Sequence, residues 1–279
     1  METGRASRTA LRVAHRRAVH QVLDHPCVLD DPIALHLLGS EFVIDRDREA
    51  HPIARAFRAF MAARSRFAED ELAKAAEKGI AQYVVLGAGL DTFAYRSPYP
   101  NLHVFEVDFP ATQEWKRSLL HAAAIEIPCG VTFVPLDFEH MTHTKGLTAA
   151  GFDLKAPAFF GWLGVAPYLS LEAFRATISA IAKLPPPTAV VFDFAISPEL
   201  LGPRARIAFE TLSARVAAAG EPFRLFFKPD DLESELLRAG FESVEIVGAD
   251  ELNARYFSGR SDGLMLPSPG LGMIATAHN

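Results

Sequence analysis

One segment constrains the fold more than any other: residues 83–92, with the sequence YVVLGAGLDT. Its β-prone residues lead into a Gly-x-Gly turn at Gly87 and Gly89, and a second β-prone run, VFEVD at residues 104–108, ends in acid about 20 residues later. The two glycines let the backbone turn sharply and approach a ligand without a Cβ in the way. The carboxylates of the second run can accept hydrogen bonds from a ribose diol. This layout is typical of a Rossmann-type nucleoside site.

The same segment indicates which nucleoside compound would suit the site. The third glycine of a dinucleotide fingerprint is absent, and Asp91 stands where the pyrophosphate would lie. A carboxylate repels two phosphates but attracts a sulfonium or an amino group. We therefore expect the site to favour S-adenosylmethionine over NAD.

Composition limits the class of protein. The 279 residues are 49% apolar, enough for one large α/β domain with decorations or for two small domains. Lys and Arg number 28 against 34 Asp and Glu, and this net charge of −6 disfavours wrapping a nucleic-acid backbone.

Compartment and partners follow from the apolar runs and the cysteines. The longest apolar run, residues 156–169, contains two prolines and is too short to span a bilayer. Cys27 and Cys129 are the only cysteines, too few for a disulfide framework. We expect a cytoplasmic protein with a small-molecule substrate and with neither a nucleic-acid nor a membrane partner; its oligomeric state is left open.

Hydrophobic periodicity divides the chain into a helical part and an alternating part. Residues 1–79 are predicted to form an N-terminal helical cap, with a helix start at Asp31-Pro32 and a helix end at Gly79. From residue 80 onward strands alternate with helices, which predicts a mainly parallel sheet covered on both faces. The seven expected strands are 83–86, 102–107, 131–135, 158–162, 189–194, 243–247 and 273–277.

The predicted fold class is therefore α/β, with a Rossmann-like core over residues 80–279. Ser170 and Pro229 are predicted to begin two of its helices, and Gly240 to end the second. The last two strands are expected to form an antiparallel hairpin at one edge of the sheet. Residues 196–228 form a helical insertion, and this insertion and the N-terminal cap are candidates for a substrate lid.

Residues that follow the third and fourth strands are candidates for ligand contact, because ligands bind at the carboxyl ends of such strands. Asp137 and Phe138 offer the carboxylate and the apolar wall that an adenine requires. Trp162 and Tyr168, in the run FGWLGVAPYL at residues 160–169, are candidates for lining the acceptor pocket. Taken singly, Phe138 and Trp162 could instead be core residues, Asp137 a turn residue and Tyr168 a structural phenol.

Arginines near the first strand are candidates for gripping a carboxylate. Arg64 or Arg66 could bind the carboxylate of an amino acid through two hydrogen bonds, and we expect the other to lie on a solvated helix face. Arg96, after the glycine turn, could cap a helix or face the ligand.

Other patterns carry less weight. His140 and His143 have a metal-like spacing but no obvious third ligand. We find neither a Gly-x-Ser-x-Gly nucleophile elbow nor a Walker phosphate loop, so hydrolase and nucleoside-triphosphatase functions lack support.

Several of these runs together resemble a known family. LGAGLDT at residues 86–92, FEVDFP at 105–110 and Asp137-Phe138 resemble the leucine carboxyl methyltransferase family, above all its bacterial branch of S-adenosylmethionine-dependent O-methyltransferases, some of which act on polyketides. LDDPIA at 29–34 and the Arg64-Ser65-Arg66 stretch also resemble that branch. The likeness runs from about residue 10 to the C-terminus.

The resemblance implies a cofactor and roles for individual residues. S-adenosylmethionine would be bound with its methionine carboxylate on Arg64 and its methionine part against Gly87. Asp108 would bind the ribose hydroxyls, and Asp137 and Phe138 the adenine. The predicted cofactor site is completed by Ala88, Gly89, Asp91, Glu106, Val107 and Leu163.

Two positions depart from the family pattern. Phe93 stands where an arginine is frequent, and Leu163 stands where the family usually carries a glutamate near the cofactor's amino group. The WLGVxPYL form occurs in a subset of the branch, so we interpret it as a variant site. Asp91 or a backbone carbonyl could take over the amino-group contact.

The functional hypothesis is methyl transfer to an oxygen of a small molecule. A carboxylate acceptor needs no general base, whereas a phenol or alcohol needs a base or a lowered pKa. No histidine follows the fourth strand, which favours a carboxylate or an acidic phenol. Two alternatives stay open: a nicotinamide-dependent oxidoreductase, and a catalytically silent S-adenosylmethionine-binding module.

Overall fold

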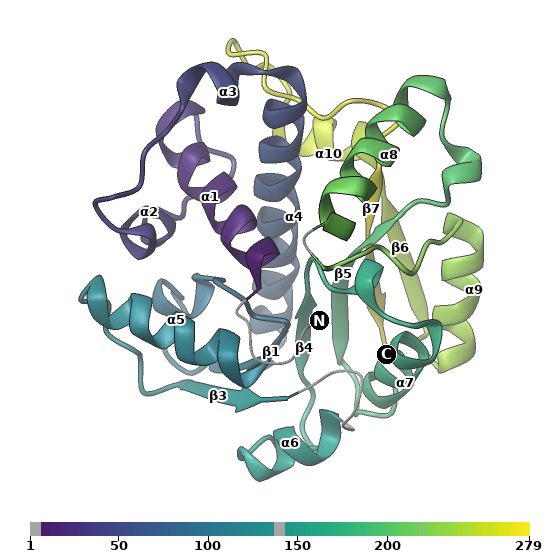
Figure 1. Cartoon of the computed structure of the whole chain (residues 1–279). Coiled ribbons are helices and arrows are strands. Elements are labelled where there is room, and N and C mark those ends of the chain that lie inside the picture. The colour runs from purple at the N-terminus through teal and green to yellow at the C-terminus, as the bar shows by residue number, and fades with distance from the viewer. Residues whose placement is uncertain (1–6, 137–142, 219) are drawn as a thin grey trace.

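The computed structural model describes residues 7–136, 143–218 and 220–279. Within these residues, seven strands form one sheet in the order β3-β2-β1-β4-β5-β7-β6 (Figure 1). The four pairings among the five strands from β3 to β5 are parallel, and β7 is antiparallel to both of its neighbours. The strands are β1 (Gln82–Leu86), β2 (His103–Asp108), β3 (Val131–Pro135), β4 (Phe159–Trp162), β5 (Ala189–Ala195), β6 (Ser243–Val247) and β7 (Gly272–His278).

The predicted α/β fold class and all seven expected strands are confirmed, with bounds that differ by at most one residue. One detail of the hairpin prediction is wrong. β6 and β7 do pair antiparallel, but α10 (Ala249–Tyr256) lies between them in the chain and β7 enters the sheet between β5 and β6. Strand β6 is therefore the edge strand on this side of the sheet, opposite β3.

Helices cover both faces of the sheet because its strands carry apolar side chains on both sides. One face packs against α6 (His143–Ala149), α7 (Leu171–Ile181) and α9 (Pro229–Ala239), whose buried residues include Leu147, Phe174 and Leu232. The other face packs against α4 (Pro52–Glu77) and α10, through residues such as Phe67 and Leu252. Alternate residues of each strand thus belong to two separate cores.

Local signals set the helix ends as predicted. The Asp31 side chain accepts a hydrogen bond from the Ala34 N–H and caps α2 (Pro32–Leu38), and the Ser170 side chain caps α7 in the same way. Helix α9 begins at Pro229 and ends before Gly240, which has a left-handed backbone. Gly79, with a φ of 85°, follows the end of α4.

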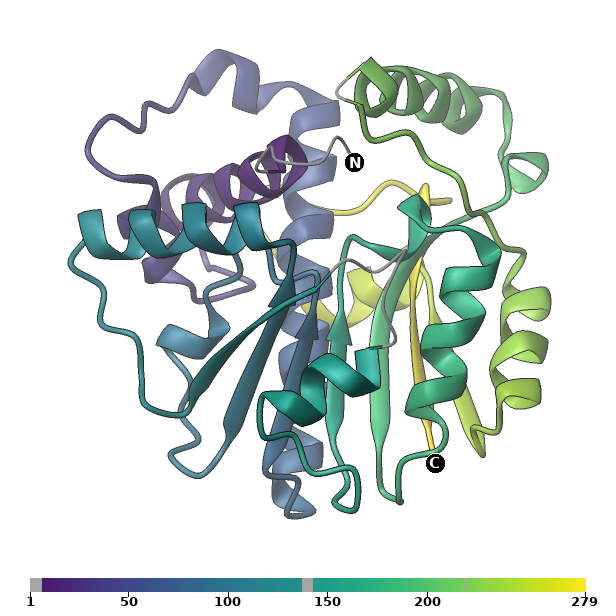
Figure 2. The same cartoon turned by 60° about the horizontal axis from the view of Figure 1, so that its bottom comes forward.

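The N-terminal helices and the insertion lie over the same end of the sheet. Helices α1 (Arg8–Leu23) and α8 (Pro203–Ala218) face each other across the carboxyl ends of the parallel strands, whereas α3 (Arg46–Ala50) and α5 (Pro110–Ala122) lie farther out (Figure 2). Short helical turns η1 (Phe93–Tyr95), η2 (Ala166–Tyr168) and η3 (Pro198–Leu200) follow β1, β4 and β5. The predicted division into a cap over 1–79 and a core over 80–279 stays a prediction, and α4 is itself a layer on the sheet.

Among the described helices, none combines the length and the apolar character that crossing a membrane requires.

Candidate cofactor site

The glycine turn after β1 is fastened to the neighbouring strand. Gly87 and Gly89 have φ angles of 70° and 48°. The N–H groups of Gly87 and Ala88 both donate to the Val107 carbonyl, at 2.8 and 2.9 Å. A Cβ on Gly87 would lie 2.3 Å from Val165 Cγ2, so the turn requires glycine for its conformation and for space.

Asp108, at the end of β2, lies directly beside this turn. Its Oδ2 accepts from the Gly89 N–H at 2.6 Å and its Oδ1 from the Phe109 N–H at 2.7 Å. Burial raises the pKa of the Asp108 carboxyl, and the two backbone donors oppose that rise. The two parts of the sequence motif therefore meet, with a carboxylate next to the glycine backbone.

Arg64 reaches the neighbouring strand ends from the middle of α4. Its Nη1 donates to Asp193 Oδ2 at 2.8 Å, and Asp193 Oδ1 accepts from the Gly164 N–H at 2.5 Å. Arg64 is 5% exposed, and among the described residues its Nε has no hydrogen-bond partner. A buried guanidinium with a free donor is suited to an anionic ligand group.

The structure distinguishes the two candidate arginines. Arg66 points away from the sheet, with a side chain 48% exposed, and pairs with Asp70 one turn along α4 at 2.7 Å. Only Arg64 lies at the carboxyl ends of the strands.

Asp91 is paired, which corrects the electrostatic interpretation of the sequence. Arg17 of α1 donates from Nη1 to Asp91 Oδ2 at 2.9 Å and from Nη2 to the Leu90 carbonyl at 2.5 Å. Burial opposes ionisation, but Arg17 and Lys116 outweigh it and the pKa of Asp91 is lowered. Its charge is thus compensated by Arg17, so Asp91 does not give the site a free negative charge for a sulfonium or an amino group.

Glu106 is a buried structural residue, which corrects its prediction as a ribose ligand. Its Oε2 accepts from Lys116 Nζ at 2.6 Å and from the Tyr95 hydroxyl at 3.2 Å. Burial raises the pKa of Glu106, and Lys116 opposes the rise. Because Glu106 lies two residues before the strand end, α5 covers it, and Asp108 alone stands at the rim.

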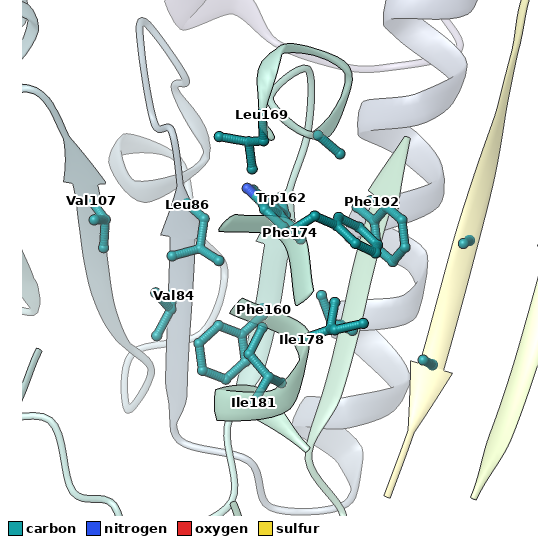
Figure 3. Packing of buried hydrophobic residues seen from close by; sticks show 14 of the residues in the cluster. Val84, Leu86, Val107, Phe160, Trp162, Leu169, Phe174, Ile178, Ile181 and Phe192 are labelled. Carbon is teal, nitrogen blue, oxygen red and sulfur yellow. The ribbon is translucent and has the colours of Figure 1, made fainter. Parts of the chain in front are cut away.

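Trp162 lies in the core, which corrects its prediction as a lining residue of the acceptor pocket. Its side chain is 0% exposed and stacks on Phe174 of α7, with ring centroids 5.5 Å apart (Figure 3). Phe192 of β5 adjoins the same indole at 5.7 Å. Position 162 faces the α7 side of the sheet, away from Arg64 and α4.

Leu163 and Tyr168 follow β4 on the way to α7. Leu163 is half-buried and packs against the core on the α4 side. Tyr168 is half-buried beside Phe223 of the insertion, with ring centroids 5.2 Å apart. Burial raises the pKa of its phenol, with Glu221 as the next cause, so the phenol stays protonated at neutral pH.

Two predicted cofactor residues, Asp137 and Phe138, lie outside the described residues, as does His140. The roles of Asp137 and Phe138 therefore stay predictions. In the parts of the chain that the structure describes, no group of three or more His, Cys, Asp or Glu side chains is placed to hold a metal ion.

Three charged residues around the site were not predicted from the sequence. Asp193 is hidden in the apolar strand AVVFDFA, where a single acid among β-prone residues was the available signal. Arg17 and Asp31 hold the N-terminal helices against the glycine turn: Asp31 accepts from the Thr92 hydroxyl at 2.6 Å and lies 3.4 Å from Arg17 Nε. The Arg96 side chain forms ion pairs with Asp31 and Glu69 and does not cap the η1 turn that it follows.

The parallel sheet, the glycine turn and Asp108 at the next strand end define a Rossmann-like protein with a nucleoside-binding geometry. Comparison with known families identifies the family to which the chain belongs. Residues 10–182 match the model of the leucine carboxyl methyltransferase family, and the chain belongs to that family.

Individual relatives carry names that fit this family. The chain is 32% identical to a Bacillus subtilis protein named "Putative S-adenosyl-L-methionine-dependent methyltransferase YktD", over 95% of each chain. It is 33% identical to the similarly named ML2020 of Mycobacterium leprae, over 91% of this chain and 76% of that protein. The predicted family and the predicted class, a methyltransferase that uses S-adenosylmethionine, are confirmed, and the oxidoreductase alternative is not favoured.

Solved structures support the fold. A "putative methyltransferase" from Thermobifida fusca superposes with a TM-score of 0.58 at 19% identity, covering 88% of this chain and 92% of that one. A DUF574 family protein from Streptomyces avermitilis gives a TM-score of 0.56 at 19% identity, covering 88% and 94%.

Proposed function

We propose that this protein transfers the methyl group of S-adenosylmethionine to an oxygen atom, a carboxylate or an acidic hydroxyl, of a small apolar molecule. One observation carries the cofactor part of the proposal. Asp108 stands beside the glycine turn at the end of β2, and Arg64, whose buried Nε has no hydrogen-bond partner among the described residues, lies at the ends of β4 and β5; only β1 separates β2 from β4 in the sheet.

The residues present fit the chemistry of that cofactor. Arg64 would hold the methionine carboxylate, because its guanidinium has donors left after its bond to Asp193. Asp108 would bind the ribose hydroxyls; in the structure its carboxylate bonds to backbone N–H groups and keeps lone pairs for further donors. Gly87 and Gly89 would leave the backbone open to close approach.

The acceptor side is supported by aromatic residues of the insertion. Phe223 adjoins Tyr168, and Phe209 and Phe226 pack in the same cluster, with ring centroids 5.5 Å apart. These rings favour an acceptor with an apolar or aromatic body. The Tyr168 hydroxyl, which stays protonated, can donate a hydrogen bond to an acceptor oxygen but is not a base at neutral pH.

Mechanistically, the protein has mainly to align and desolvate the reactants. S-adenosylmethionine, when bound, supplies a methyl group on a positively charged sulfur that needs no further activation. A carboxylate acceptor is ionised at neutral pH and therefore needs no proton transfer. Tyr168 would orient the acceptor oxygen, while α1 and the insertion exclude water. A cationic acceptor nitrogen would first have to lose a proton, which is why we favour oxygen.

A labelling experiment tests this proposal. The purified protein would be incubated with methyl-labelled S-adenosylmethionine and matched sets of aromatic acids, their amides, phenols and amines. We expect label in acids or acidic phenols, with acid products releasing methanol in alkali and with no label in the matched amides. Label found only on nitrogen or carbon would contradict the oxygen assignment. Cofactor binding without turnover on any acceptor would favour the silent module.

A further inference from the structure

Arg64, Asp193 and Gly164 form one packed unit. Asp193 of β5 uses one carboxylate oxygen for Arg64 Nη1 and the other for the Gly164 N–H. Gly164 has a φ of 72°, and a Cβ there would lie 3.0 Å from both Nη1 and Nη2 of Arg64. The backbone after β4 thus approaches the guanidinium closely, and both charged side chains are held by α4, β4 and β5.

The Arg64–Asp193 pair keeps both an unused hydrogen-bond donor and unused acceptor positions. Arg64 and Asp193 are 5% and 6% exposed, so neither charge is well solvated. Arg64 Nε has no partner among the described residues, and each Asp193 oxygen has accepted one bond of the two it can take. An amino-acid zwitterion carries a carboxylate and an ammonium on one carbon. The guanidinium of Arg64 would suit its carboxylate, and the neighbouring carboxylate of Asp193 would suit its ammonium.

The position of the pair indicates which part of a ligand it would meet. Asp193 lies near the end of β5, on the face of the sheet that packs against α4, where it bonds to Arg64. Gly164 contacts Arg64, and its neighbour Val165 contacts Gly87, so the pair lies close to the glycine turn after β1. Leu163, beside it, is apolar and offers no charge to an ammonium.

We propose that Asp193 is a second binding residue of this site: it fixes Arg64 in place and accepts a hydrogen bond from the α-ammonium of the cofactor's amino-acid part. Arg64 and Asp193 together would recognise the zwitterion. This inference rests on the proposed function, since it assigns one end of the same ligand.

Calorimetry on the full chain can isolate the contact. Three ligands would be used: S-adenosylhomocysteine, its deaminated analogue, which keeps the carboxylate, and 5′-methylthioadenosine, which lacks the amino-acid part. In the natural protein we expect S-adenosylhomocysteine to bind at least about 10-fold more tightly than the deaminated analogue, the usual worth of a hydrogen bond between charged groups. In Asp193→Asn that ratio should fall to within about 3-fold, a coupling measured as in a double-mutant cycle.

Two controls separate this contact from a general loss of structure. Asp70→Asn removes the carboxylate from another Arg–Asp pair of similar length, at a half-buried position of α4 where Asp70 also bonds to Tyr256, and should keep the ratio. Binding of 5′-methylthioadenosine should stay within about 3-fold in Asp193→Asn if the fold is intact. If that variant unfolds, Asp193→Glu, which keeps the charge but displaces it by one methylene, should reduce the ratio instead.

An unchanged ratio in the folded Asp193 variant would overturn the proposal. So would an equal loss for all three ligands, because it would mean that Asp193 only supports the fold. Failure of the natural protein to bind either S-adenosylhomocysteine or 5′-methylthioadenosine would instead contradict the proposed function itself.

Discussion

At the residue scale, Gly87 and Asp108 contribute to the site in different ways, one through close packing and the other through a hydrogen bond. Gly87 combines a left-handed backbone with contact to Val165, whereas Gly79, also with positive φ, has no atom within 4 Å of a Cβ position. Asp108 bonds to the glycine turn itself. The close packing at Gly87 and the carboxylate at Asp108 can therefore be tested separately.

Gly87→Ala should destabilise the protein more than Gly79→Ala. Both substitutions lower the free energy of unfolding by about 1–2 kcal/mol, because they place an alanine in the left-handed region. Only the new Cβ at position 87 meets Val165, at 2.3 Å, and overpacking of this kind costs about 1–3 kcal/mol more. Urea unfolding measures both free energies. Equal losses at the two positions would show that Val165 yields without cost.

Asp108→Ala should weaken the binding of S-adenosylhomocysteine by about 1–3 kcal/mol, because partners of a hydrogen-bonded charge would be left unsatisfied. Titration calorimetry provides the affinity, and Asp70→Ala, at a half-buried position of α4, is the control. An unchanged affinity in Asp108→Ala would mean that the ribose lies elsewhere.

At the element scale, buried ion pairs hold α1 against the rest of the molecule. Arg17 joins α1 to the glycine turn through Asp91 and to α2 through Asp31. Farther along, Asp24 after α1 accepts from Arg58 of α4 at 2.6 and 2.9 Å and bonds to His20. Helix α1, which would cover the site, is thus held by ion pairs at two points.

Arg17→Met should lower the free energy of unfolding by about 3 kcal/mol, since it leaves Asp91 with an uncompensated, largely buried charge. Arg12→Met, on the exposed side of the same helix, should stay within about 0.5 kcal/mol of the natural protein. Urea unfolding compares the two. A similar, small effect at both positions would show that Arg17 does not fasten α1.

Asp24 also makes stability depend on pH. Burial raises its pKa, but the hydrogen bonds from His20 and Arg58 outweigh this and lower it from 3.8 to about 2. The folded state therefore binds the proton less tightly than the unfolded state does. The stabilisation is fully present above pH 4 and is lost as the pH falls towards 2.

The stability difference between the natural protein and Asp24→Asn should accordingly be constant from pH 7 to pH 5. Below pH 4 it should shrink, by about 2 kcal/mol in total. Denaturant unfolding at each pH measures this difference. A difference that stays constant down to pH 3 would contradict the assigned pKa shift.

The sequence predicted elements better than side-chain partners, for a physical reason. Strands and helix ends depend on local signals such as Pro229 and Gly240, which act on their own neighbours in the chain. The roles of Asp91, Glu106 and Trp162 depend on Arg17, Lys116 and Phe174, whose proximity is created only by folding. A motif could therefore locate the site but not say which of its acids were already paired.

At the scale of the whole molecule, the carboxyl edge of the sheet carries the charged groups, and segments from distant parts of the chain lie over it. Ser7, just before α1, donates to Glu221, just after α8, and Ala10 lies against Gly89. The two segments on either side of the site in Figure 2 are thus in contact. This hydrogen bond joins two residues that are 214 positions apart in the chain.

The central claim is that the carboxyl ends of β1, β2, β4 and β5 bind S-adenosylmethionine. Calorimetry with S-adenosylhomocysteine and with NAD on the same preparation tests it most directly. We expect saturable binding of S-adenosylhomocysteine with one site per chain and no measurable heat from NAD. Saturable binding of NAD alone would contradict the claim.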